Sequence, residues 1–248
     1  MKDNVAVIIL AAGQGTRMKS NKAKVLHEID GRPMIQYVVK AAQKIAGENV
    51  IAVIGHQAQK VQETISDSAS IYFAYQEKQL GTAHAVQCAM PNIPDNCDEV
   101  IILCGDVPLI RSRTIAELVE DHLSAARDIT LLAVEIENPH GYGRILVDEN
   151  GTVFGIVEEA DATDDQKQIK LINAGIYCIR KAFLLNSLPK ISANNAQSEL
   201  YLTDIIGIAH TENKKIGVMV GSNPSEVIGV NTIQELQRVE TILRKSSL

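Results

Sequence analysis

Continuous runs of apolar residues alternate with amphipathic stretches along most of the chain. Residues 5–10, 49–55, 100–104 and 129–136 are almost entirely apolar, as is typical of strands buried on both faces of a parallel sheet. Residues 34–45 instead carry apolar side chains at helical spacing, between a helix start at residues 31–34 and Gly47. The pattern also predicts strands at residues 70–76, 171–179 and 216–220, and helices at 57–65, 81–90, 112–126 (capped by Ser112), 201–212 and 232–245. This order predicts an α/β fold with a mostly parallel sheet and helices on both faces.

The alternation changes between residues 138 and 200. Asn150 and Gly151 stand between apolar runs at residues 144–148 and 152–157, and Asn-Gly in that position is a strong hairpin signal. The acidic, polar run at residues 158–168 is expected to form a surface loop. We therefore expect a smaller antiparallel insert at about residues 138–200.

Length and composition set the broad class. The chain has 248 residues, 46% of them hydrophobic, and no internal repeat or linker divides it. We expect one domain over residues 1–231 that contains the insert, followed by a C-terminal helix over residues 232–248. The formal net charge of −6 disfavours a broad electrostatic surface for nucleic acid or membrane. A phosphate ligand would therefore need a local cluster of cations.

Cysteine usage and the apolar runs bear on the compartment. The four cysteines include no Cys-x-x-Cys pair, so neither a zinc site nor a disulfide framework is indicated. Cys104 and Cys178 lie inside apolar runs and are expected to be buried thiols. The first apolar run is too short for a signal peptide, and no apolar stretch reaches 18 residues. These features favour the cytoplasm.

A glycine-rich loop follows the first apolar strand. Residues 10–18 read Leu-Ala-Ala-Gly-Gln-Gly-Thr-Arg-Met, and Lys24 comes shortly afterwards. Gly13 and Gly15 allow a sharp turn and close approach of backbone N–H groups to a ligand. Arg17 and Lys24 supply charge that can face phosphate oxygens. Since ligands of open α/β sheets bind at the carboxyl ends of strands, the loop predicts a site for a nucleoside triphosphate.

Three other interpretations of this loop compete with a triphosphate site. A plain strand-to-helix turn explains the glycines alone, because an isolated Gly-x-Gly is a weak motif. A dinucleotide fingerprint fails, because Met18 stands at the third glycine position and the second strand ends in Gly55-His56 without an acidic residue. A Walker A sequence does not occur in the chain.

Two side chains are candidates for a metal site. Asp106 directly follows the strand at residues 100–104, where a carboxylate could hold Mg²⁺ against phosphate oxygens. The alternative is a turn aspartate before Pro108. Asn231, with Gln234 three residues later, is by itself better explained as the cap of the last helix. A role as metal ligand competes with the cap interpretation of Asn231 only if a partner such as Asp106 lies beside it.

Neutral polar groups mark two further candidate regions. Gln76, Gly81 and Thr82 follow the third strand and offer amide, backbone and hydroxyl groups to a base edge, although an ordinary loop and N-cap explain them equally well. The insert carries groups suited to a polyol, namely Gly143 in the sequence Tyr-Gly-Arg, Glu158 and Asn173. Each of these alone is more often a turn residue or an exposed charge. His84 is expected to be a satisfied helix residue rather than a general base.

Ten motifs spread over the whole chain carry a resemblance to a known family. Besides residues 10–18 they are Lys24-Val-Leu-His27, Gln79-Leu-Gly-Thr-Ala-His-Ala85, Gly105-Asp-Val-Pro-Leu-Ile110, Gly141-Tyr-Gly-Arg-Ile145, residues 156–159, 172–173 and 194–197, Tyr201-Leu-Thr-Asp204, and Gly229-Val-Asn231. With them the chain resembles the sugar-nucleotidyltransferases, and among these the uridyltransferase domain of bacterial N-acetylglucosamine-1-phosphate uridyltransferases. The resemblance implies a Rossmann-like fold of the nucleotide-diphospho-sugar transferase type.

The resemblance also implies roles for individual residues. Nucleotide binding would fall to Leu10, Ala11, Ala12, Gly13, Gly15, Thr16, Gln76, Gly81 and Thr82. The catalytic cations would be Arg17 and Lys24, the sugar-binding residues Gly143, Glu158 and Asn173, and the Mg²⁺ ligands Asp106 and Asn231. The chain departs from the family pattern at Ala23, where Pro is usual, and at Ala174, where Thr is usual.

The implied reaction is Mg²⁺-dependent transfer of a uridylyl group from UTP to N-acetylglucosamine 1-phosphate. Its products would be UDP-N-acetylglucosamine, a precursor for peptidoglycan and lipopolysaccharide, and pyrophosphate. The expected partners are these substrates, without nucleic acid or membrane, and homo-oligomerisation is left open. A different sugar 1-phosphate and a non-catalytic nucleotide-sugar-binding protein remain alternatives. Bifunctional family members continue into a hexapeptide-repeat β-helix with acetyltransferase activity; these 248 residues contain no such repeats, so we expect no acetyl transfer.

Overall fold

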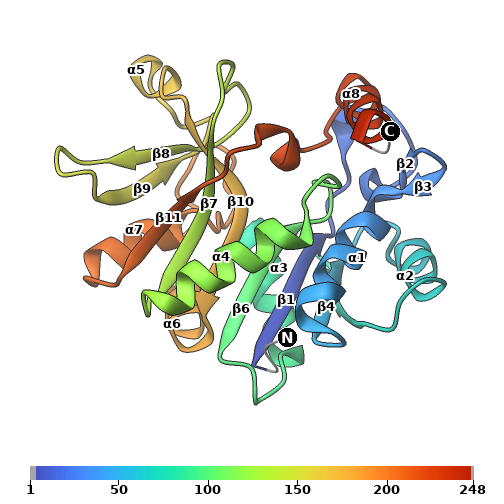
Figure 1. Ribbon diagram of the computed structural model, residues 1–248, viewed down its shortest axis with the longest axis horizontal. Coiled ribbons are helices and arrows are strands. Elements are labelled where there is room, and N and C mark those ends of the chain that lie inside the picture. Colours follow the sequence, from blue (N-terminus) through green and yellow to red (C-terminus); the bar gives the residue numbers. More distant parts are fainter. Residues whose placement is uncertain (1–3, 247–248) are drawn as a thin grey trace.

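The computed structural model describes residues 4–246, which form a nine-stranded sheet between layers of helices (Figure 1). The strands of this sheet are β1 Val5–Ala11, β4 Val50–Ile54, β5 Tyr72–Tyr75, β6 Glu99–Cys104, β7 Ile129–Glu135, β8 Arg144–Val147, β9 Val153–Val157, β10 Leu171–Arg180 and β11 Ile216–Val220. The α-helices are α1 Met34–Ala46, α2 Ala58–Ser66, α3 Thr82–Ala89, α4 Ser112–Ser124, α5 Asp164–Lys167, α6 Lys181–Ser187, α7 Asp204–Thr211 and α8 Ile233–Ser246. The predicted α/β fold is confirmed.

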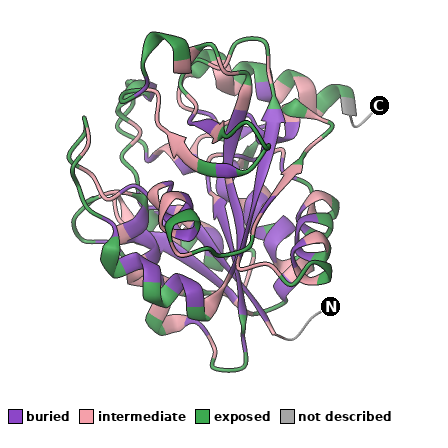
Figure 2. Ribbon diagram, turned by 90° about the vertical axis from the view of Figure 1, so that its left-hand side faces the viewer, coloured by how far each residue is buried: buried purple, intermediate pink, exposed green. Residues whose placement is uncertain are grey.

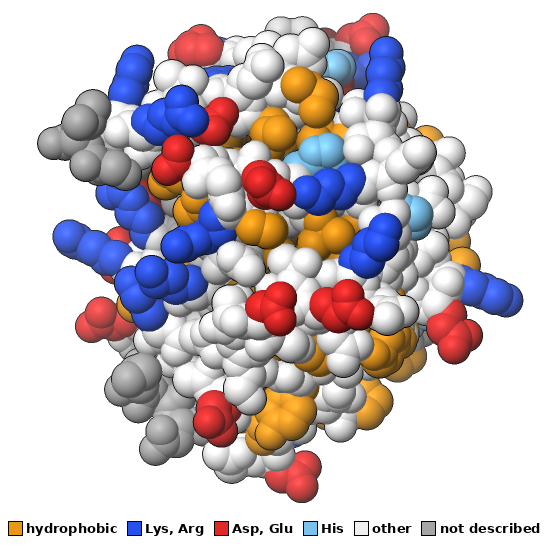
Figure 3. Space-filling model, turned by 90° about the vertical axis from the view of Figure 1, so that its right-hand side faces the viewer, with side chains coloured by type: hydrophobic (Ala, Val, Ile, Leu, Met, Phe, Trp, Pro, Cys, Tyr) orange, Lys and Arg blue, Asp and Glu red, His pale blue; other side chains and the backbone are white. Residues whose placement is uncertain are grey.

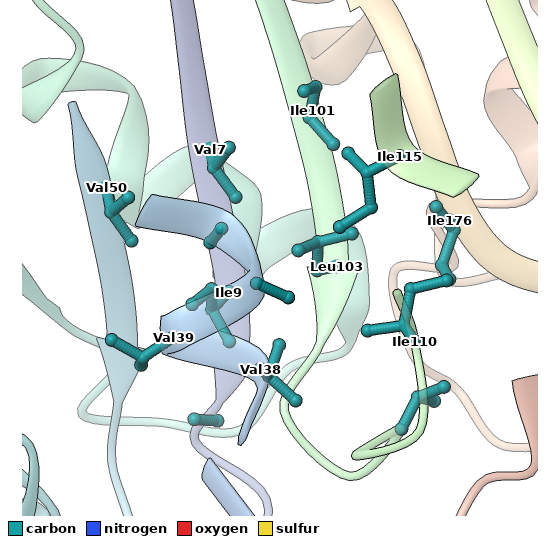
Figure 4. Packing of buried hydrophobic residues seen from close by; sticks show 14 of the residues in the cluster. Val7, Ile9, Val38, Val39, Val50, Ile101, Leu103, Ile110, Ile115 and Ile176 are labelled. Carbon is teal, nitrogen blue, oxygen red and sulfur yellow. The ribbon is translucent and has the colours of Figure 1, made fainter. Parts of the chain in front are cut away.

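Alternation of side chains along the central strands explains the layers. Val7 and Ile9 of β1 pack on one face of the sheet with residues of α1, α2 and α4, including Val38 and Val39 of α1 (Figure 4). Ile8 of β1 points to the opposite face and packs with residues of α3, α6 and α7. Because both faces are covered, the strands are buried along most of their length (Figure 2). This is why they read as continuous apolar runs in the sequence.

The antiparallel strand β10 joins the two halves of the sheet. The strand order is β11-β7-β10-β6-β1-β4-β5, with β1, β4, β5 and β6 parallel to one another and β10 antiparallel to both β6 and β7. The predicted hairpin is present as β8 and β9, and β8 pairs with the start of β10. The region expected to form an insert therefore supplies a strand to the middle of the main sheet and is continuous with it.

Helix α1 begins at Met34, the last residue of the predicted start, because residues 32–33 pair with residues 28–29 in a small hairpin, β2 Glu28–Ile29 and β3 Arg32–Pro33. Two other local predictions are wrong, each for a local physical reason. Ser112 is the first residue of α4 and does not cap it, since Arg111 occupies the N-cap position without a side-chain hydrogen bond. Part of the expected loop at residues 158–168 is helical, because Thr163 and Gln166 form a capping box that starts α5.

Other expectations can be compared with the burial of single residues. Cys178 is fully buried as predicted, whereas Cys104 is half-buried at the end of β6. Residues 247–248 of the predicted terminal helix lie outside the described part of the chain. Within residues 4–246, no helix combines the length and the apolar composition needed to cross a membrane.

Charged side chains are not confined to the glycine-rich loop. On the face that contains α1 and α2, acidic and basic groups are interspersed, with Lys and Arg gathered toward one side (Figure 3). A cavity of about 670 Å³ between α1, the start of α4 and α8 is rimmed by Arg32, Lys40, Lys44, Arg111 and Arg113. Arg17 and Lys24 are therefore not the sole local group of cations among the described residues.

Candidate active site

The glycine-rich loop leaves the carboxyl end of β1 and folds back on itself. It contains two short 3-10 turns, Thr16–Met18 and Lys24–Leu26. Gly15 has a φ of 70°, and a methyl group placed on it would lie 2.5 Å from Cβ of Lys24. Only glycine permits this contact. A methyl group on Gly13 would meet no atom within 4 Å, so space is available beside the backbone there. The loop thus holds the stem of Lys24 next to an open backbone surface.

A small apolar cluster places Arg17 and Asn231 side by side. Met18 and Val230 are both buried in this cluster, together with Ile29, Met34 and Val239. Arg17 precedes Met18 and Asn231 follows Val230, so packing of the two apolar neighbours brings both polar side chains to one spot. The backbone N–H of Val230 also donates to the backbone carbonyl of Asp106, at 2.9 Å. That hydrogen bond ties the segment before α8 to the end of β6.

Four predicted site residues consequently meet, although they are far apart in the sequence. The amide oxygen of Asn231 accepts hydrogen bonds from Arg17 Nη2 at 2.9 Å and from Lys24 Nζ at 3.0 Å. The same Lys24 ammonium pairs with the carboxylate of Asp106. The side chains of Lys24 and Asp106 are only 16% and 18% exposed. The structure therefore brings together both predicted cations and both predicted metal ligands.

The cap of α8 does not use the side chain of Asn231. Glu235 Oε2 accepts from the backbone N–H of Thr232 at 2.8 Å, and Thr232 Oγ1 accepts from the backbone N–H of Glu235 at 3.2 Å. This reciprocal pair is a capping box one residue later than the predicted Asn231–Gln234 pair. The cap prediction is wrong, and the side chain of Asn231 is left to contact Arg17 and Lys24.

A cavity of about 420 Å³ opens beside this group of four residues. Its lining comes from the glycine-rich loop, from the segment after β5 and from the end of β6: Leu10, Ala11, Ala12, Gly13, Gln14, Gly15, Thr16, Lys24, Val25, Gln76, Gln79, Gly81, Thr82, Ala85, Cys104, Asp106 and Glu199. All nine residues predicted to bind the nucleotide are among them. Arg17 and Asn231 do not line the cavity, but Asn231 contacts Lys24, which does.

The predicted base-edge residues also hold the wall of this cavity together. The side-chain amide of Gln76 donates to the carbonyl of Gly81 at 3.0 Å and lies 3.1 Å from His84 Nδ1. Thr82 Oγ1 accepts from the backbone N–H of Leu202 at 2.9 Å. The side chain of His84 is therefore engaged within its own helix and loop, as predicted. Thr82 has a structural role in addition to any contact with a ligand.

Gly81 lets two backbone segments touch. Its φ is 117°, and a methyl group on it would lie 2.5 Å from the carbonyl oxygen of Leu200. Leu200 N–H donates to the carbonyl of Leu80 at 2.8 Å, and Ala83 N–H donates to the carbonyl of Leu200 at 2.9 Å. These bonds bring the segment around residue 200 over the cavity.

Replacement of Gly81 should open this contact. We expect Gly81→Ala to lower the free energy of unfolding in two ways. A residue other than glycine is strained at this positive φ, and the methyl group cannot fit against Leu200, which should cost roughly a further 1–3 kcal/mol. Nucleotide affinity should fall with it. Gly31→Ala is the matched control, since Gly31 has a φ of 73° and a methyl group there would meet nothing within 4 Å. Urea unfolding of both variants checks this; equal losses would show that the contact with Leu200 is unimportant.

The predicted sugar-binding residues form a second group. The backbone N–H of Asn173 donates to the carbonyl of Gly143 at 2.9 Å, and a methyl group on Gly143 would lie 3.4 Å from Glu158 Oε2. The Asn173 side chain donates to the hydroxyl of Tyr177 at 2.7 Å and accepts from the backbone N–H of Gly175 at 3.1 Å. These three residues do not line the glycine-rich cavity.

Cys104 stands between the two groups. Its thiol donates to the carbonyl of Gly175 at 3.5 Å, and Cys104 also lines the glycine-rich cavity. Burial, assisted by the nearby charge of Asp106, raises the pKa of this thiol to about 12. The thiol is therefore protonated at neutral pH and is not an activated nucleophile. Cys104 therefore connects the glycine-rich cavity to Gly175, whose N–H donates to the Asn173 side chain.

Sequence reasoning missed some residues of the cavity. Gln14, Val25, Gln79, Ala85 and Glu199 line it but were not predicted as site residues. Gln79, next to the predicted segment, donates to the carbonyl of Gln76 at 3.1 Å. Glu199 could have been suspected only from its position between two family motifs, at residues 194–197 and 201–204.

Comparisons with known proteins agree with this arrangement. The model of the MobA-like NTP transferase domain matches residues 7–169, and the chain belongs to this family. Two curated relatives bear the name "Bifunctional protein GlmU". The one from Desulfotalea psychrophila is 46% identical over 98% of this chain and 72% of its own length. The one from Pelobacter propionicus is 44% identical over 98% of this chain and 53% of its own length.

A solved structure shows the same fold at low identity. HddC from Yersinia pseudotuberculosis, complexed with GMP-PN, superimposes with a TM-score of 0.70 at 18% identity, over 96% of this chain and 99% of that one. The chain spans about half the length of several of the curated relatives it matches. Together the matches confirm the predicted resemblance and the predicted enzyme class, a sugar-1-phosphate nucleotidyltransferase.

Proposed function

We propose that this protein transfers a uridylyl group from UTP to N-acetylglucosamine 1-phosphate, with Mg²⁺, and releases UDP-N-acetylglucosamine and pyrophosphate. The observation that carries the proposal is that Arg17, Lys24, Asp106 and Asn231 meet beside a glycine-lined cavity, which Lys24 and Asp106 line. Identity of 44–46% to GlmU proteins over nearly the whole chain favours this choice of substrates within the family.

The chain's own residues account for the chemistry of such a transfer. An oxygen of the sugar phosphate bonds to the α-phosphorus of UTP, while the bond from that phosphorus to the pyrophosphate oxygen breaks. The attacking oxygen is already an anion, so no strong general base is required. Lys24 and Arg17 neutralise charge that develops on the phosphates, and the glycine-rich loop orients the triphosphate.

Asp106 and Asn231 are suited to hold the metal. A carboxylate and an amide oxygen both contact one cationic group, the Lys24 ammonium, so their acceptor atoms already converge on a single positive charge. Such oxygen ligands suit Mg²⁺, which takes few ligands from protein. When bound, the ion would supply charge neutralisation and a template for the phosphates.

The substrates can be identified by measuring pyrophosphate release with a panel of nucleoside triphosphates and sugar 1-phosphates. We expect UTP with N-acetylglucosamine 1-phosphate to give the highest kcat/KM. Equal rates with UTP and purine triphosphates would contradict the proposed nucleotide. A preference for another sugar 1-phosphate would support the alternative acceptor, and UDP-sugar binding without turnover would indicate a non-catalytic protein.

The buried charge of Glu158 lowers stability at neutral pH, whereas the same carboxylate is proposed to bind the sugar. Burial raises the pKa of Glu158, while Thr203 Oγ1 donates to its Oε1 at 3.0 Å. The folded state therefore binds a proton on the Glu158 carboxylate more tightly than the unfolded state does. For this reason the contribution of Glu158 to stability is greatest below its ordinary pKa of 4.5. It is lost as the pH rises through the raised value in the folded state.

Glu158→Gln should therefore be more stable than the native protein at neutral pH. The amide keeps an acceptor for Thr203 but removes a buried charge. Urea unfolding should show that this gain shrinks as the pH falls toward 4.5. If Glu158 binds the sugar, kcat/KM for the sugar phosphate should drop roughly 10–100-fold, as for lost hydrogen bonds to a charged group. A gain in stability that is the same at both pH values would contradict the account of burial.

A further inference from the structure

The Lys24 ammonium occupies the point at which the proposed metal ligands converge. It pairs with the carboxylate of Asp106 and donates to Asn231 Oδ1 at 3.0 Å. Asn231 Oδ1 also accepts from Arg17 at 2.9 Å. In the described structure, both acceptors of the proposed metal site are therefore already in contact with the chain's own cations.

A divalent cation and an ammonium group compete for these acceptors, because both are positively charged and seek the same oxygens. The pair of Lys24 and Asp106 is more than four-fifths buried, where the attraction between opposite charges is stronger than in water. A metal ion that enters alone must break this pair and leave a partly buried ammonium without its counter-charge. Without a nucleotide, the site should consequently bind a metal ion more weakly than it would if Lys24 were not paired with Asp106.

The loop offers Lys24 a second position. The backbone of Gly15 lies close against the base of the Lys24 side chain, since a methyl group added to Gly15 would be 2.5 Å from Cβ of Lys24. Beyond that contact the four-carbon stem is flexible. Lys24 lines the glycine-rich cavity as well as contacting Asp106. Phosphates bound in this cavity would give the ammonium a new anionic partner within reach of the same stem.

We propose that Lys24 is an internal counter-ion that holds the metal ligands closed until a nucleotide binds. Phosphates in the cavity draw the ammonium away, and Asp106 and Asn231 then accept a divalent ion. This inference rests on the proposed function, because it uses the same metal site. Nucleotide and metal must then favour each other reciprocally, with coupling in the usual range of roughly 5–150-fold.

The test is a titration of the nucleotide-free protein with Mn²⁺, followed by electron paramagnetic resonance. We expect Lys24→Met to bind Mn²⁺ at least ~10-fold more tightly than the native protein, within the usual range of coupling. Lys22→Met is the matched control, since it removes the same charge from an exposed pair with Glu28 in the same loop. Lys24→Gln, with a neutral donor in place of the ammonium, serves if Lys24→Met does not fold.

The second arm adds the α,β-methylene analogue of UTP, with correction for Mn²⁺ bound by the free analogue. It should tighten Mn²⁺ binding to the native protein more than to Lys24→Met. Equal Mn²⁺ affinity of Lys24→Met, Lys22→Met and the native protein would overturn the counter-ion role. A separate result tests the metal site itself: if Asp106→Asn leaves Mn²⁺ binding unchanged in every background, the proposed metal site is wrong as well.

Discussion

Asp106→Asn is expected to lower kcat/KM for pyrophosphate release by on the order of 10³-fold, the upper range for loss of one preorganised electrostatic group. The amide retains an oxygen that can accept a hydrogen bond from Lys24 but carries no charge for a metal ion. Folding should be less affected, because Asp106 lies after the end of β6 and its backbone bond to Val230 is unchanged. We expect a loss of about 1 kcal/mol in the free energy of unfolding.

A control variant and a double variant test this prediction further. Asp98→Asn changes an exposed aspartate just before the other end of β6 and should leave kcat/KM unchanged. The double variant of Asp106→Asn with Asn231→Ala should be hardly worse than either single variant, because residues that act as one unit are not additive. Independent multiplication of the two losses would show that these side chains do not serve one ion.

Arg17→Ala should reduce kcat/KM by on the order of 10²-fold, as for other groups that stabilise developing negative charge. Arg17 is exposed and its side chain donates a hydrogen bond to Asn231, so the free energy of unfolding should change by less than about 0.5 kcal/mol. Steady-state kinetics and urea unfolding measure the two effects separately.

The same loop provides a control for Arg17. Lys22→Ala removes an exposed cation that pairs with Glu28 at 3.1 Å and should have little effect on kcat/KM. If both variants lost activity equally, the general charge of the loop would explain the result. If Arg17→Ala had near-normal activity, Arg17 would have no role in charge neutralisation.

Periodicity predicted the parallel half of the sheet because its strands are covered on both faces. β1, β4 and β6 each appear as an unbroken apolar run, and their order with the helices limits the topology. Helix α6 was missed, since its seven residues follow β10 directly and have no side-chain cap. The hairpin of β2 and β3 was missed although Asp30-Gly31 is a turn sequence, because each strand has only two residues.

The candidate site was predictable in its residue types but not in how they meet. Glycines, cations and a carboxylate at strand ends suggested a phosphate site. The contact of Asn231 with Arg17 depends on burial of Met18 beside Val230, which no local pattern reveals. The error at the cap of α8 arose because Thr232–Glu235 offers the same kind of signal one residue later. Because the capping box begins at Thr232 and not at Asn231, the side chain of Asn231 is free of the helix cap and contacts Arg17 and Lys24.

The central position of β10 also governs the order in which the chain can assemble during synthesis. β1, β4, β5 and β6 pair with one another and are all complete by residue 104. β7 pairs only with β10 and β11 among the described strands, so it has no partner in that first half. Until residue 180 has left the ribosome, the open edge of β6 is a template for incorrect pairing. Attachment of β7 to the first half of the sheet thus waits for the late strand β10.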